Sequence, residues 1–205
     1  MKVVLGYPYA GTVHGVFARC LWELVQYESR RDAIELEIAP QEGPYIHQNR
    51  NMLCRYALQT GADYLLQIDV DMEFPPDLVE RFVAHDKDIV AGLYHRFVDG
   101  NTVSPLLFQR HPVMGKFISV GKTGDGLIEI DGAGTGLMMV KRRVLDTIRR
   151  EYRGASPWFF FESLDDDNEL TDDLSFCNRA KVCGFEIWGD CDVPVSHWKR
   201  IKLTN

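Results

Sequence analysis

Two carboxylates lie one residue apart in the stretch LLQIDVDMEFPPD, which runs from Leu65 to Asp77. The apolar residues before Asp69 predict a buried strand, and in an extended backbone alternate side chains point to the same face. Asp69 and Asp71 are therefore expected to lie side by side at the end of that strand. Two like charges there repel each other and lose hydration unless a positive group lies between them. The pair indicates either a site for a positive group or an ordinary strand-to-loop junction, where aspartate is common.

The composition is that of an ordinary globular protein. A chain of 205 residues, with 45% hydrophobic and 26% charged residues, predicts a single domain. The formal net charge of −7 argues against a protein that holds nucleic acid by bulk electrostatics. The basic strip WKRIK, from Trp198 to Lys202, is a candidate local exception, and a solvated C-terminal tail is the alternative explanation for it.

The cysteines and the N-terminus predict a soluble, cytoplasmic protein. The five cysteines include no C-x-x-C pair and no zinc-ligand spacing, which favours reduced structural thiols. The start MKVVLGYPYAGTVHG has one lysine and an apolar run too short for a signal peptide. No window of the sequence has the length and apolar character of a membrane span.

Strands and helices alternate in the first half of the sequence. Strands are predicted at 2–9, 33–40, 63–69 and 88–94, and helices at 13–25, 45–60 and 75–86. This alternation predicts a parallel sheet with right-handed crossovers. Ligands of such sheets bind beyond the carboxyl ends of the strands, where Asp69 and Asp71 are placed.

The second half has a different pattern. Short strands at 105–111, 116–120 and 127–132 have no helices between them, which predicts antiparallel additions to the same sheet. A further strand at 134–142, a helix at 143–152, an aromatic and acidic loop at 158–170, a helix at 171–184 and a strand at 186–190 follow. The predicted class is α/β.

Three local patterns resemble ligand sites but lack the required residues. SVGKTGDG has Lys116 where a P-loop needs its first glycine, and no helix follows. DGAGTG has the wrong glycine spacing for a dinucleotide site and precedes a strand. The acidic run Asp165, Asp166, Asp167 and Glu169 lacks the glycine and terminal glutamate of a calcium loop, so a solvated loop is expected.

Several stretches, taken together and in order, resemble nucleotide-sugar-dependent glycosyltransferases of the GT-A fold, especially the small family-2-like enzymes of bacteria and viruses. The motifs are YPYAG after the first strand, the Arg-Asn pair in HQNRNMLCRYAL, the D-x-D motif in DVDMEFPPD, GAGTGLMMVKR, TDDLSFCNRAKVCG and SHW. The resemblance implies a single Rossmann-like domain with a mixed, mostly parallel central sheet flanked by helices. Its nucleotide-sugar-binding half is expected at 1–97 and its acceptor and catalytic half at 98–205.

The resemblance also implies a metal-bound donor. The D-x-D carboxylates would bind a divalent cation that bridges the diphosphate of a UDP- or GDP-sugar, and hard oxygen ligands suit Mg²⁺ or Mn²⁺. Asp71 is expected to contact the metal directly, and Asp69 to bind the ribose or support the metal indirectly. His197 is expected as a further ligand, which would favour Mn²⁺; a half-buried surface histidine is the alternative.

Further donor-site residues follow from the same resemblance. Arg50 is expected to point toward the nucleotide phosphates or base, and an exposed helix charge is the alternative. The loop expected against the base consists of Pro8, Tyr9 and Ala10. Gly134 and Gly136 are expected to allow close approach of the backbone to the donor sugar, although a strand-edge turn explains them equally.

The catalytic base is expected at the start of the last long helix. In the family an acid at this position removes the acceptor hydroxyl proton, which implies Asp173, with Asp172 in the place of the family's glutamate. A structural explanation competes, because Thr171 is a favourable N-cap and acids in a first turn interact well with the helix dipole. Glu162 is the reserve candidate for the base, and the aromatic residues from Trp158 to Phe161 line either an acceptor site or the core.

Several functions remain open at this stage. Transfer with inversion is the leading hypothesis, and a retaining transferase on the same fold is the first alternative. A nucleotidyltransferase and a non-catalytic sugar-nucleotide-binding protein are remoter alternatives. The acceptor can be a glycan, a small molecule or a modified nucleic-acid base, such as the hydroxymethylated DNA bases that viral relatives glycosylate.

Overall fold

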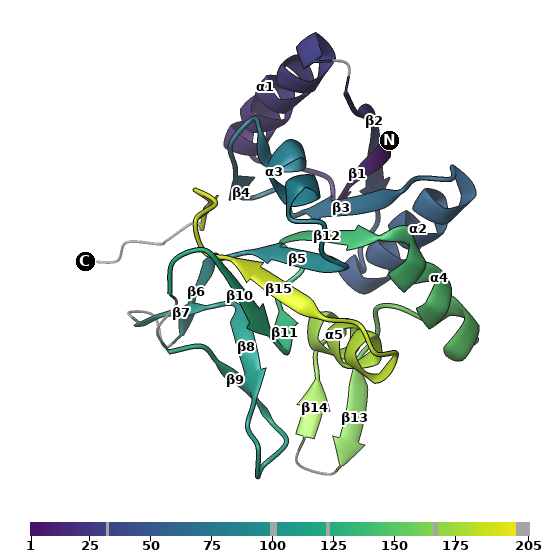
Figure 1. Ribbon diagram of the computed structural model, residues 1–205, viewed down its shortest axis with the longest axis vertical. Helices are drawn as coiled ribbons and strands as arrows, with labels where there is room; N and C mark the ends of the chain where they lie inside the picture. The colour runs from purple at the N-terminus through teal and green to yellow at the C-terminus, as the bar shows by residue number, and fades with distance from the viewer. Residues whose placement is uncertain (32, 99–101, 122–123, 166–167, 200–205) are drawn as a thin grey trace.

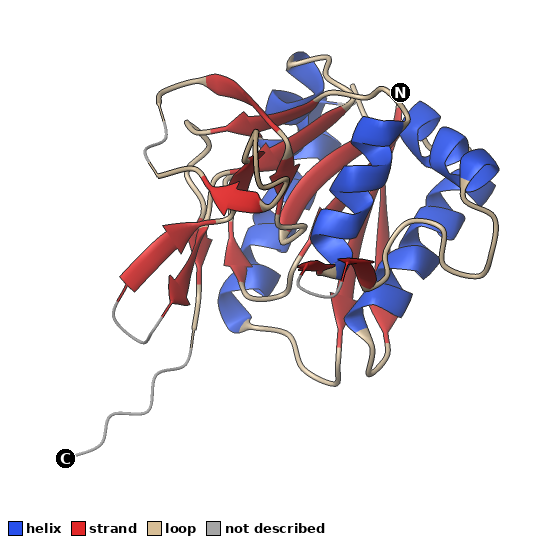
Figure 2. Cartoon of the chain, turned by 90° about the horizontal axis from the view of Figure 1, so that it is seen from below, coloured by secondary structure: helices blue, strands red, loops and turns tan. Residues whose placement is uncertain are grey.

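The computed structural model describes residues 1–31, 33–98, 102–121, 124–165 and 168–199. A seven-stranded sheet forms the centre of the molecule, with helices on both of its faces (Figures 1 and 2). The helices are α1 (Gly15–Arg31), α2 (Ile46–Gln59), α3 (Leu78–Ala84), α4 (Arg142–Glu151) and α5 (Asp172–Val182). The predicted α/β class is confirmed. None of the helices in the described part of the chain has the length and apolar character needed to cross a membrane.

The strand order in the central sheet is β10-β15-β5-β12-β3-β1-β2. The strands are β1 (Lys2–Tyr9), β2 (Glu35–Glu42), β3 (Tyr64–Ile68), β5 (Ile89–Gly92), β10 (Leu127–Ile130), β12 (Leu137–Lys141) and β15 (Ile187–Asp190). Strands β2, β1, β3, β5 and β15 run in one direction, whereas β12 and β10 run in the other. The sheet is therefore mixed and mostly parallel, as predicted.

Strand β12 interrupts the parallel order that the first half of the sequence predicts. It pairs antiparallel with both β3 and β5, so these two strands are not neighbours. Its first four residues are fully buried, which suits a strand covered on both faces. The pairing continues past the end of β3, where the amide of Asp69 donates to the carbonyl of Gly136 at 2.9 Å. Strand β12 thus brings the glycine segment beside the D-x-D motif.

Smaller sheets surround the central one. The first contains β8 (Leu107–Arg110), β9 (Phe117–Ser119) and β11 (Gly132–Ala133). The others are the pairs β6 (His95–Val98) with β7 (Thr102–Pro105), β13 (Glu162–Asp165) with β14 (Asn168–Leu170), and β16 (Ser196–His197) with β4 (Met72–Glu73). Pair β16–β4 joins the C-terminal segment to the turn after the D-x-D motif.

Two expectations for the second half are wrong. Only the run at 127–132 adds a strand to the central sheet, because the runs at 105–111 and 116–120 pair with each other and with β11 in a separate sheet. The segment 158–170 contains the hairpin β13–β14 instead of a plain loop, since pairing satisfies its backbone groups. Three other predicted features lie partly outside the described residues: Asp166 and Asp167 of the acidic run, Lys122 and Thr123 of SVGKTGDG, and Arg200 to Lys202 of the basic strip.

The core consists of two apolar layers, one on each face of the central sheet. One layer lies beneath α2, α4 and α5 and includes Trp158, Phe159 and Phe176. The other lies beneath α1 and α3 and includes Phe17 and Phe82. Full burial of a large apolar side chain contributes about 1.5–3 kcal/mol, so these layers hold the strands and their carboxyl ends in place.

Asn51 on α2 ties the aromatic segment before β13 to that helix. Its Nδ2 donates to the carbonyls of His47 and Phe159, both at 2.6 Å. Its Oδ1 accepts the amides of Trp158 and Phe159 at 3.2 and 3.3 Å. The residue is only 2% exposed, so water does not replace these bonds. Asn51 therefore fixes the segment against the helix that also carries Arg50.

We expect Asn51→Ala to destabilise the fold by about 2–3 kcal/mol, because it leaves buried backbone groups without partners. The measurement is the free energy of unfolding from urea denaturation. Gln48→Ala is the matched control, since Gln48 lies one turn away on the same helix with an exposed side chain. Equal stability of the two variants would contradict the assigned role of Asn51.

Candidate active site

Asp69 and Asp71 flank a turn and do not continue strand β3. The strand ends at Ile68, and the amide of Met72 donates to the carbonyl of Asp69 at 3.1 Å as the chain turns into β4. The expectation that an extended backbone places both carboxylates on one strand face is therefore wrong. The turn gives each carboxylate its own cationic partners.

Asp71 faces the C-terminal segment. Its Oδ2 lies 3.2 Å from His197 Nε2 and 2.7 Å from Lys199 Nζ. Strand β16 brings these groups together, because it pairs with β4 and the amide of Trp198 donates to the carbonyl of Asp71 at 2.9 Å. Burial raises the pKa of Asp71, but the hydrogen bonds from His197 and Lys199 outweigh it and lower the pKa to about 2. The carboxylate is thus ionised across the neutral range.

Both ring nitrogens of His197 face oxygen atoms. Nδ1 lies 2.9 Å from the carbonyl of His95, which can only accept, so Nδ1 carries a hydrogen. Nε2 then faces the Asp71 carboxylate and needs a proton or a metal ion. Burial lowers the pKa of His197, but the hydrogen bonds with Asp71 and with the carbonyl of His95, together with the charge of Asp71, raise it above its usual value. A carbonyl on the other nitrogen is the usual arrangement of a metal-ligating histidine, and a carboxylate with an imidazole suits Mn²⁺, so this pair fits a divalent cation.

The three predicted metal ligands do not gather in one cluster. Within the described residues, no group of three or more His, Cys, Asp or Glu side chains is placed to hold a metal ion together. Asp71 and His197 form a pair, whereas Asp69 turns toward Arg50. The metal roles expected of Asp71 and Asp69 therefore stay predictions.

Arg50 lies beneath the site with a buried guanidinium. Its Nη2 donates to Asp69 Oδ1 at 3.0 Å, and its Nη1 donates to the carbonyl of Thr135 at 3.3 Å. Its Nε lies 3.8 Å from an oxygen of Asp172 and 3.7 Å from one of Asp173. The side chain is 4% exposed, so it contacts carboxylates and not solvent. An exposed helix charge is excluded.

Asp173 has the surroundings of a general base. Its side chain is 27% exposed and accepts a hydrogen bond from Thr135 Oγ1 at 2.7 Å. Burial raises its pKa, Arg50 and the Thr135 bond lower it, and the nearby carboxylates of Asp172 and Asp69 raise it, which leaves the pKa at about 6. Asp172 is more buried, with one carboxylate oxygen that has no hydrogen-bond partner. Asp173 is therefore the better placed of the two acids to meet a substrate.

Glu162 lies apart from this cluster. It begins β13, opposite Leu170. One of its carboxylate oxygens is buried without a hydrogen-bond partner, and its charge acts on Arg179 and Tyr152. The geometry favours Asp173 over this reserve candidate.

Gly134 and Gly136 make room for a protein side chain, that of Tyr94. A Cβ atom at Gly134 or Gly136 would lie 2.4 or 2.5 Å from the Tyr94 hydroxyl, which accepts the Gly136 amide at 2.8 Å. Burial raises the pKa of Tyr94 well above its usual value, so the hydroxyl stays protonated. The ring also contacts His197 edge to face, with centroids 5.3 Å apart. No motif in the sequence marks Tyr94, so it is not predicted as a site residue.

The end of β1 forms the opposite side of the site. Tyr9 is fixed there, because its carbonyl accepts the Gly43 amide at 3.0 Å and its hydroxyl donates to Glu42 at 3.3 Å. Pro8 is buried in the strand, and Ala10 is exposed. A cavity of about 250 Å³ opens beyond, lined by Thr12, Val13, His14, Val70, Asp71, Trp198 and Lys199.

Three residues that line this cavity are not predicted from the sequence as site residues. The rings of Trp198 and His14 stack with centroids 5.7 Å apart, and Lys199 bonds to Asp71. The basic character of the strip WKRIK is the signal for Lys199, but it was equally explained by a solvated tail. A single histidine after the first strand gives no comparable signal for His14.

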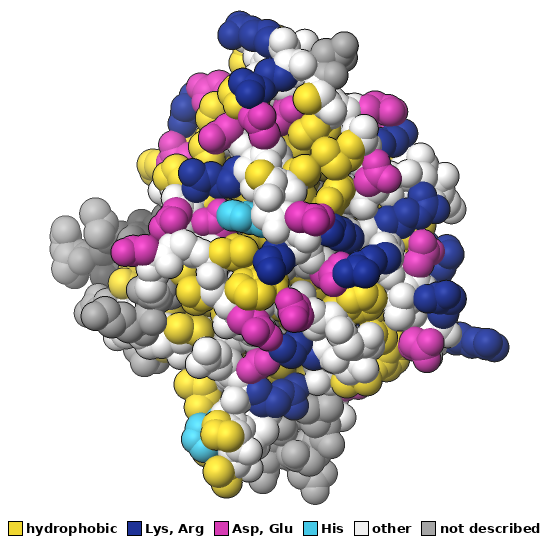
Figure 3. Space-filling model, viewed as in Figure 1, with side chains coloured by type: hydrophobic (Ala, Val, Ile, Leu, Met, Phe, Trp, Pro, Cys, Tyr) yellow, Lys and Arg dark blue, Asp and Glu magenta, His cyan; other side chains and the backbone are white. Residues whose placement is uncertain are grey.

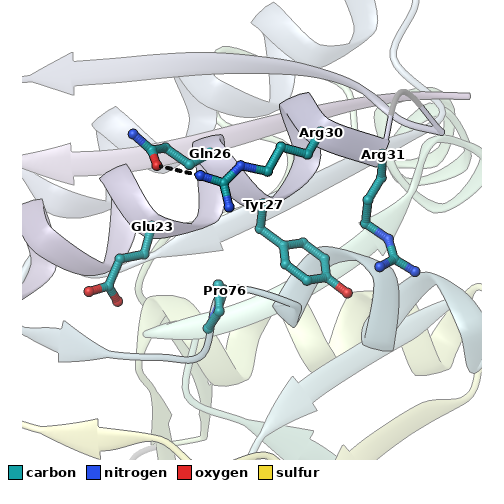
Figure 4. A pocket seen from close by; sticks show the side chains of 6 residues that line it. All are labelled: Glu23, Gln26, Tyr27, Arg30, Arg31 and Pro76. Atoms are coloured by element: carbon teal, nitrogen blue, oxygen red, sulfur yellow. Dashed lines mark hydrogen bonds between the residues drawn. The ribbon is translucent and has the colours of Figure 1, made fainter.

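Another pocket, between α1 and the segment before α3, contains none of the candidate site residues. It has a volume of about 440 Å³ and is lined by Glu23, Gln26, Tyr27, Arg30, Arg31 and Pro76 (Figure 4). Its polar groups are paired within the protein, because Arg30 donates to Gln26 while Tyr27 and Arg31 both donate to Glu80. On the face seen in Figure 3, acidic and basic side chains are interspersed. The carboxylate cluster at the end of β3 is therefore the candidate active site.

Comparison with known proteins identifies the fold. No family model matches the sequence, and no curated protein matches it. The structure of A197 from STIV matches with a TM-score of 0.58 and 17% identity, over 98% of this chain and 87% of that chain. GalNAc-T7 with UDP, GalNAc and Mn²⁺ matches with a TM-score of 0.60 and 11% identity, over 98% of this chain and 44% of that chain. This chain therefore spans less than half of GalNAc-T7.

A nucleotidyltransferase has a related structure. The inositol-1-phosphate CTP transferase from T. maritima matches with a TM-score of 0.51 and 12% identity, over 96% of this chain and 88% of that chain. At these identities the likeness concerns the fold and not the reaction. The chain has the mixed α/β architecture of GT-A type glycosyltransferases.

Proposed function

We propose that this protein is a metal-dependent glycosyltransferase that moves a sugar from a UDP- or GDP-sugar to an acceptor hydroxyl, with inversion. One observation carries the proposal. At the carboxyl end of β3, in a GT-A-like fold, Arg50 gathers Asp69 of the D-x-D motif and Asp173 of α5 around one guanidinium. A donor-side carboxylate and a candidate base are thereby brought close together, as transfer between two bound substrates requires.

On the donor side, Asp71 and His197 would hold the divalent cation and Asp69 would face the ribose. When bound, Mn²⁺ or Mg²⁺ supplies positive charge next to the departing nucleoside diphosphate. The low pKa of Asp71 keeps this carboxylate ionised as the donor binds. The end of β1, with Pro8, Tyr9 and the following Ala10, would lie against the base, and Gly134 and Gly136 near the donor sugar.

On the acceptor side, Asp173 would act as the general base. The acceptor oxygen forms a bond to the anomeric carbon while the bond from that carbon to the diphosphate oxygen breaks. The hydroxyl proton moves to Asp173, whose pKa of about 6 leaves it ionised and still basic near neutral pH. One displacement of this kind inverts the anomeric configuration, whereas a retaining enzyme would preserve it.

Nucleotidyl transfer is the second candidate, because the fold is shared with the CTP transferase. Such enzymes usually carry basic residues in the glycine-rich loop after the first strand. The corresponding loop here, YPYAGTVHG, has no lysine or arginine. The loop therefore favours sugar transfer over nucleotidyl transfer.

The test of function is a donor screen. The protein is incubated with Mn²⁺ and each common UDP- and GDP-sugar, and the released nucleoside diphosphate is measured with and without a panel of sugar acceptors. We expect release from one or a few donors, and product configuration by NMR distinguishes inversion from retention. Release of pyrophosphate from a nucleoside triphosphate and a sugar phosphate, without any diphosphate release, would favour the nucleotidyltransferase instead.

We expect Asp71→Asn to abolish the metal dependence of nucleotide binding, because it removes the charged half of the Asp71–His197 pair. The measurement is calorimetry of UDP and GDP binding with and without Mn²⁺. Asp146→Asn is the matched control, since Asp146 lies on α4 and its ionic partners among the described residues are Arg142 and Arg149. Wild-type binding that is equal after chelation of the metal would reject the metal role.

We expect sugar transfer to depend on the ionisation of Asp173. A base must be deprotonated, so a pKa of about 6 means that kcat/KM rises with pH and levels off above pH 7. Asp173→Asn should lower transfer by roughly 10²-fold to 10⁴-fold and remove the acidic limb of the pH profile. Nucleotide binding should persist in this variant.

Two companion variants decide whether the correct acid has been chosen. Asp172→Asn and Glu162→Gln should retain the acidic limb of the profile. If either of them loses transfer while Asp173→Asn keeps it, the base has been assigned to the wrong residue. If none of the three variants matters and the product retains its configuration, the inverting mechanism is rejected.

A further inference from the structure

Among the described residues, Arg50 is the one ionic partner that Asp69 and Asp173 share. It donates to Asp69 at 3.0 Å and lies 3.7 Å from Asp173 and 3.8 Å from Asp172. A single positive charge therefore faces three carboxylates that come from the end of β3 and from the start of α5. At such distances in a partly buried site, each ion pair strongly affects the others.

The guanidinium is held in place from several sides. The carbonyl of Thr135 accepts from Nη1, and the Phe159 ring lies over the guanidinium with its centroid 6.0 Å away. The side chain is 4% exposed, so it has no route to solvent without a change in the packing. Arg50 thus keeps its position, and a change in the charge of one carboxylate alters the ionisation of the others.

Thr135 adds a second link between the two acids. Its carbonyl accepts from Arg50, and its hydroxyl donates to Asp173 at 2.7 Å. The next residue, Gly136, accepts the amide of Asp69 at 2.9 Å. One short segment before β12 therefore connects the backbone of Asp69 with the side chain of Asp173.

We propose that Arg50 is a positioning residue that holds Asp69 and Asp173 close together, so that loss of the negative charge on Asp69 favours the ionised form of Asp173. The role of Asp173 as base rests on the proposed function, whereas the link itself rests on the geometry alone. Arg50 touches neither substrate in this proposal and acts through the two carboxylates. A donor hydroxyl that donates to Asp69 would disperse part of its negative charge and so favour the ionised form of Asp173, the form in which a base acts.

Other groups also face Asp173 and must be considered in any titration. They are Asp172, Asp69, Arg50, Tyr94, Cys177 and the Thr135 hydroxyl. Asp172 and Asp69 oppose its ionisation, and Arg50 and the Thr135 bond favour it. Burial raises the pKa of Tyr94 well above its usual value and raises the pKa of Cys177 to about 12. Both side chains therefore stay neutral over the pH range in which Asp173 titrates.

The test follows the Asp173 carboxyl carbon by ¹³C NMR from pH 4 to pH 9, with the signal assigned from its loss in Asp173→Asn. Arg50→Met should raise the midpoint of the Asp173 titration by about 1–3 pH units, because the opposite charge is removed. Asp69→Asn, which is nearly isosteric, should lower the midpoint by about half a unit or more, because a like charge is removed. The two variants are thus expected to shift the same group in opposite directions.

Arg55→Met is the matched control. Arg55 lies on the same helix, and its guanidinium faces Met52 and the carbonyl of Ala155 instead of the three carboxylates. We expect its Asp173 midpoint to stay within about 0.3 unit of the wild-type value, since a distant charge is screened by solvent. A shift as large as that of Arg50→Met would mean that net charge, and not the Arg50 contact, sets the titration.

The outcome is decisive even if Arg50→Met does not fold, because Asp69→Asn tests the same link from the other side. An unchanged Asp173 midpoint in Asp69→Asn would overturn the proposal. The result is also independent of the donor screen. Opposite shifts in a protein that transfers no sugar would support the link and reject the proposed function, whereas transfer without these shifts would support the function and reject the link.

Discussion

The buried guanidinium of Arg50 is the constraint on which the site depends. Removing a positive charge from water costs several kcal/mol unless it is paired and hydrogen-bonded. Here Asp69 and the carbonyl of Thr135 accept from it, and Asp172 and Asp173 surround its Nε. These partners come from the end of β3, the segment before β12 and the start of α5. The need to compensate one charge therefore fixes three segments, distant in sequence, relative to α2.

Close packing, in addition to charge, fixes the positions of the groups around this cluster. Tyr94 occupies the space that a side chain at Gly134 or Gly136 would fill, and its hydroxyl accepts the Gly136 amide. Asn51 holds the segment before β13 against α2, so the aromatic ring of Phe159 lies next to Arg50. A close-packed interior transmits small displacements, which makes these supporting contacts part of the site.

Each carboxylate of the D-x-D motif has its own cationic partners, which offset the repulsion between the two. Asp69 is turned inward to a buried arginine, and Asp71 is turned outward to His197 and Lys199 at the other end of the chain. The turn between them, and the pairing of β16 with β4, keep these environments apart. A buried charge cluster and a more exposed carboxylate–imidazole pair are thus adjacent. Under the proposed function, Asp69 would affect the base while Asp71 would meet a metal ion.

Much of the fold was determined by the sequence alone. Alternating strands and helices in the first half, the positions of Asp69 and Asp71 beyond a strand, and the acids at the start of α5 follow from local periodicity and capping, which are properties of neighbouring residues. Periodicity cannot show which strands pair, and so the insertion of β12 between β3 and β5 was decided by tertiary structure. The same is true of Tyr94 beside the glycines, Arg50 among three acids and Lys199 on Asp71. Each of these contacts joins segments that are far apart in the chain. The free energy of a buried charge or a close-packed ring depends on the groups that surround it in space, and the neighbouring residues in the sequence do not specify those groups.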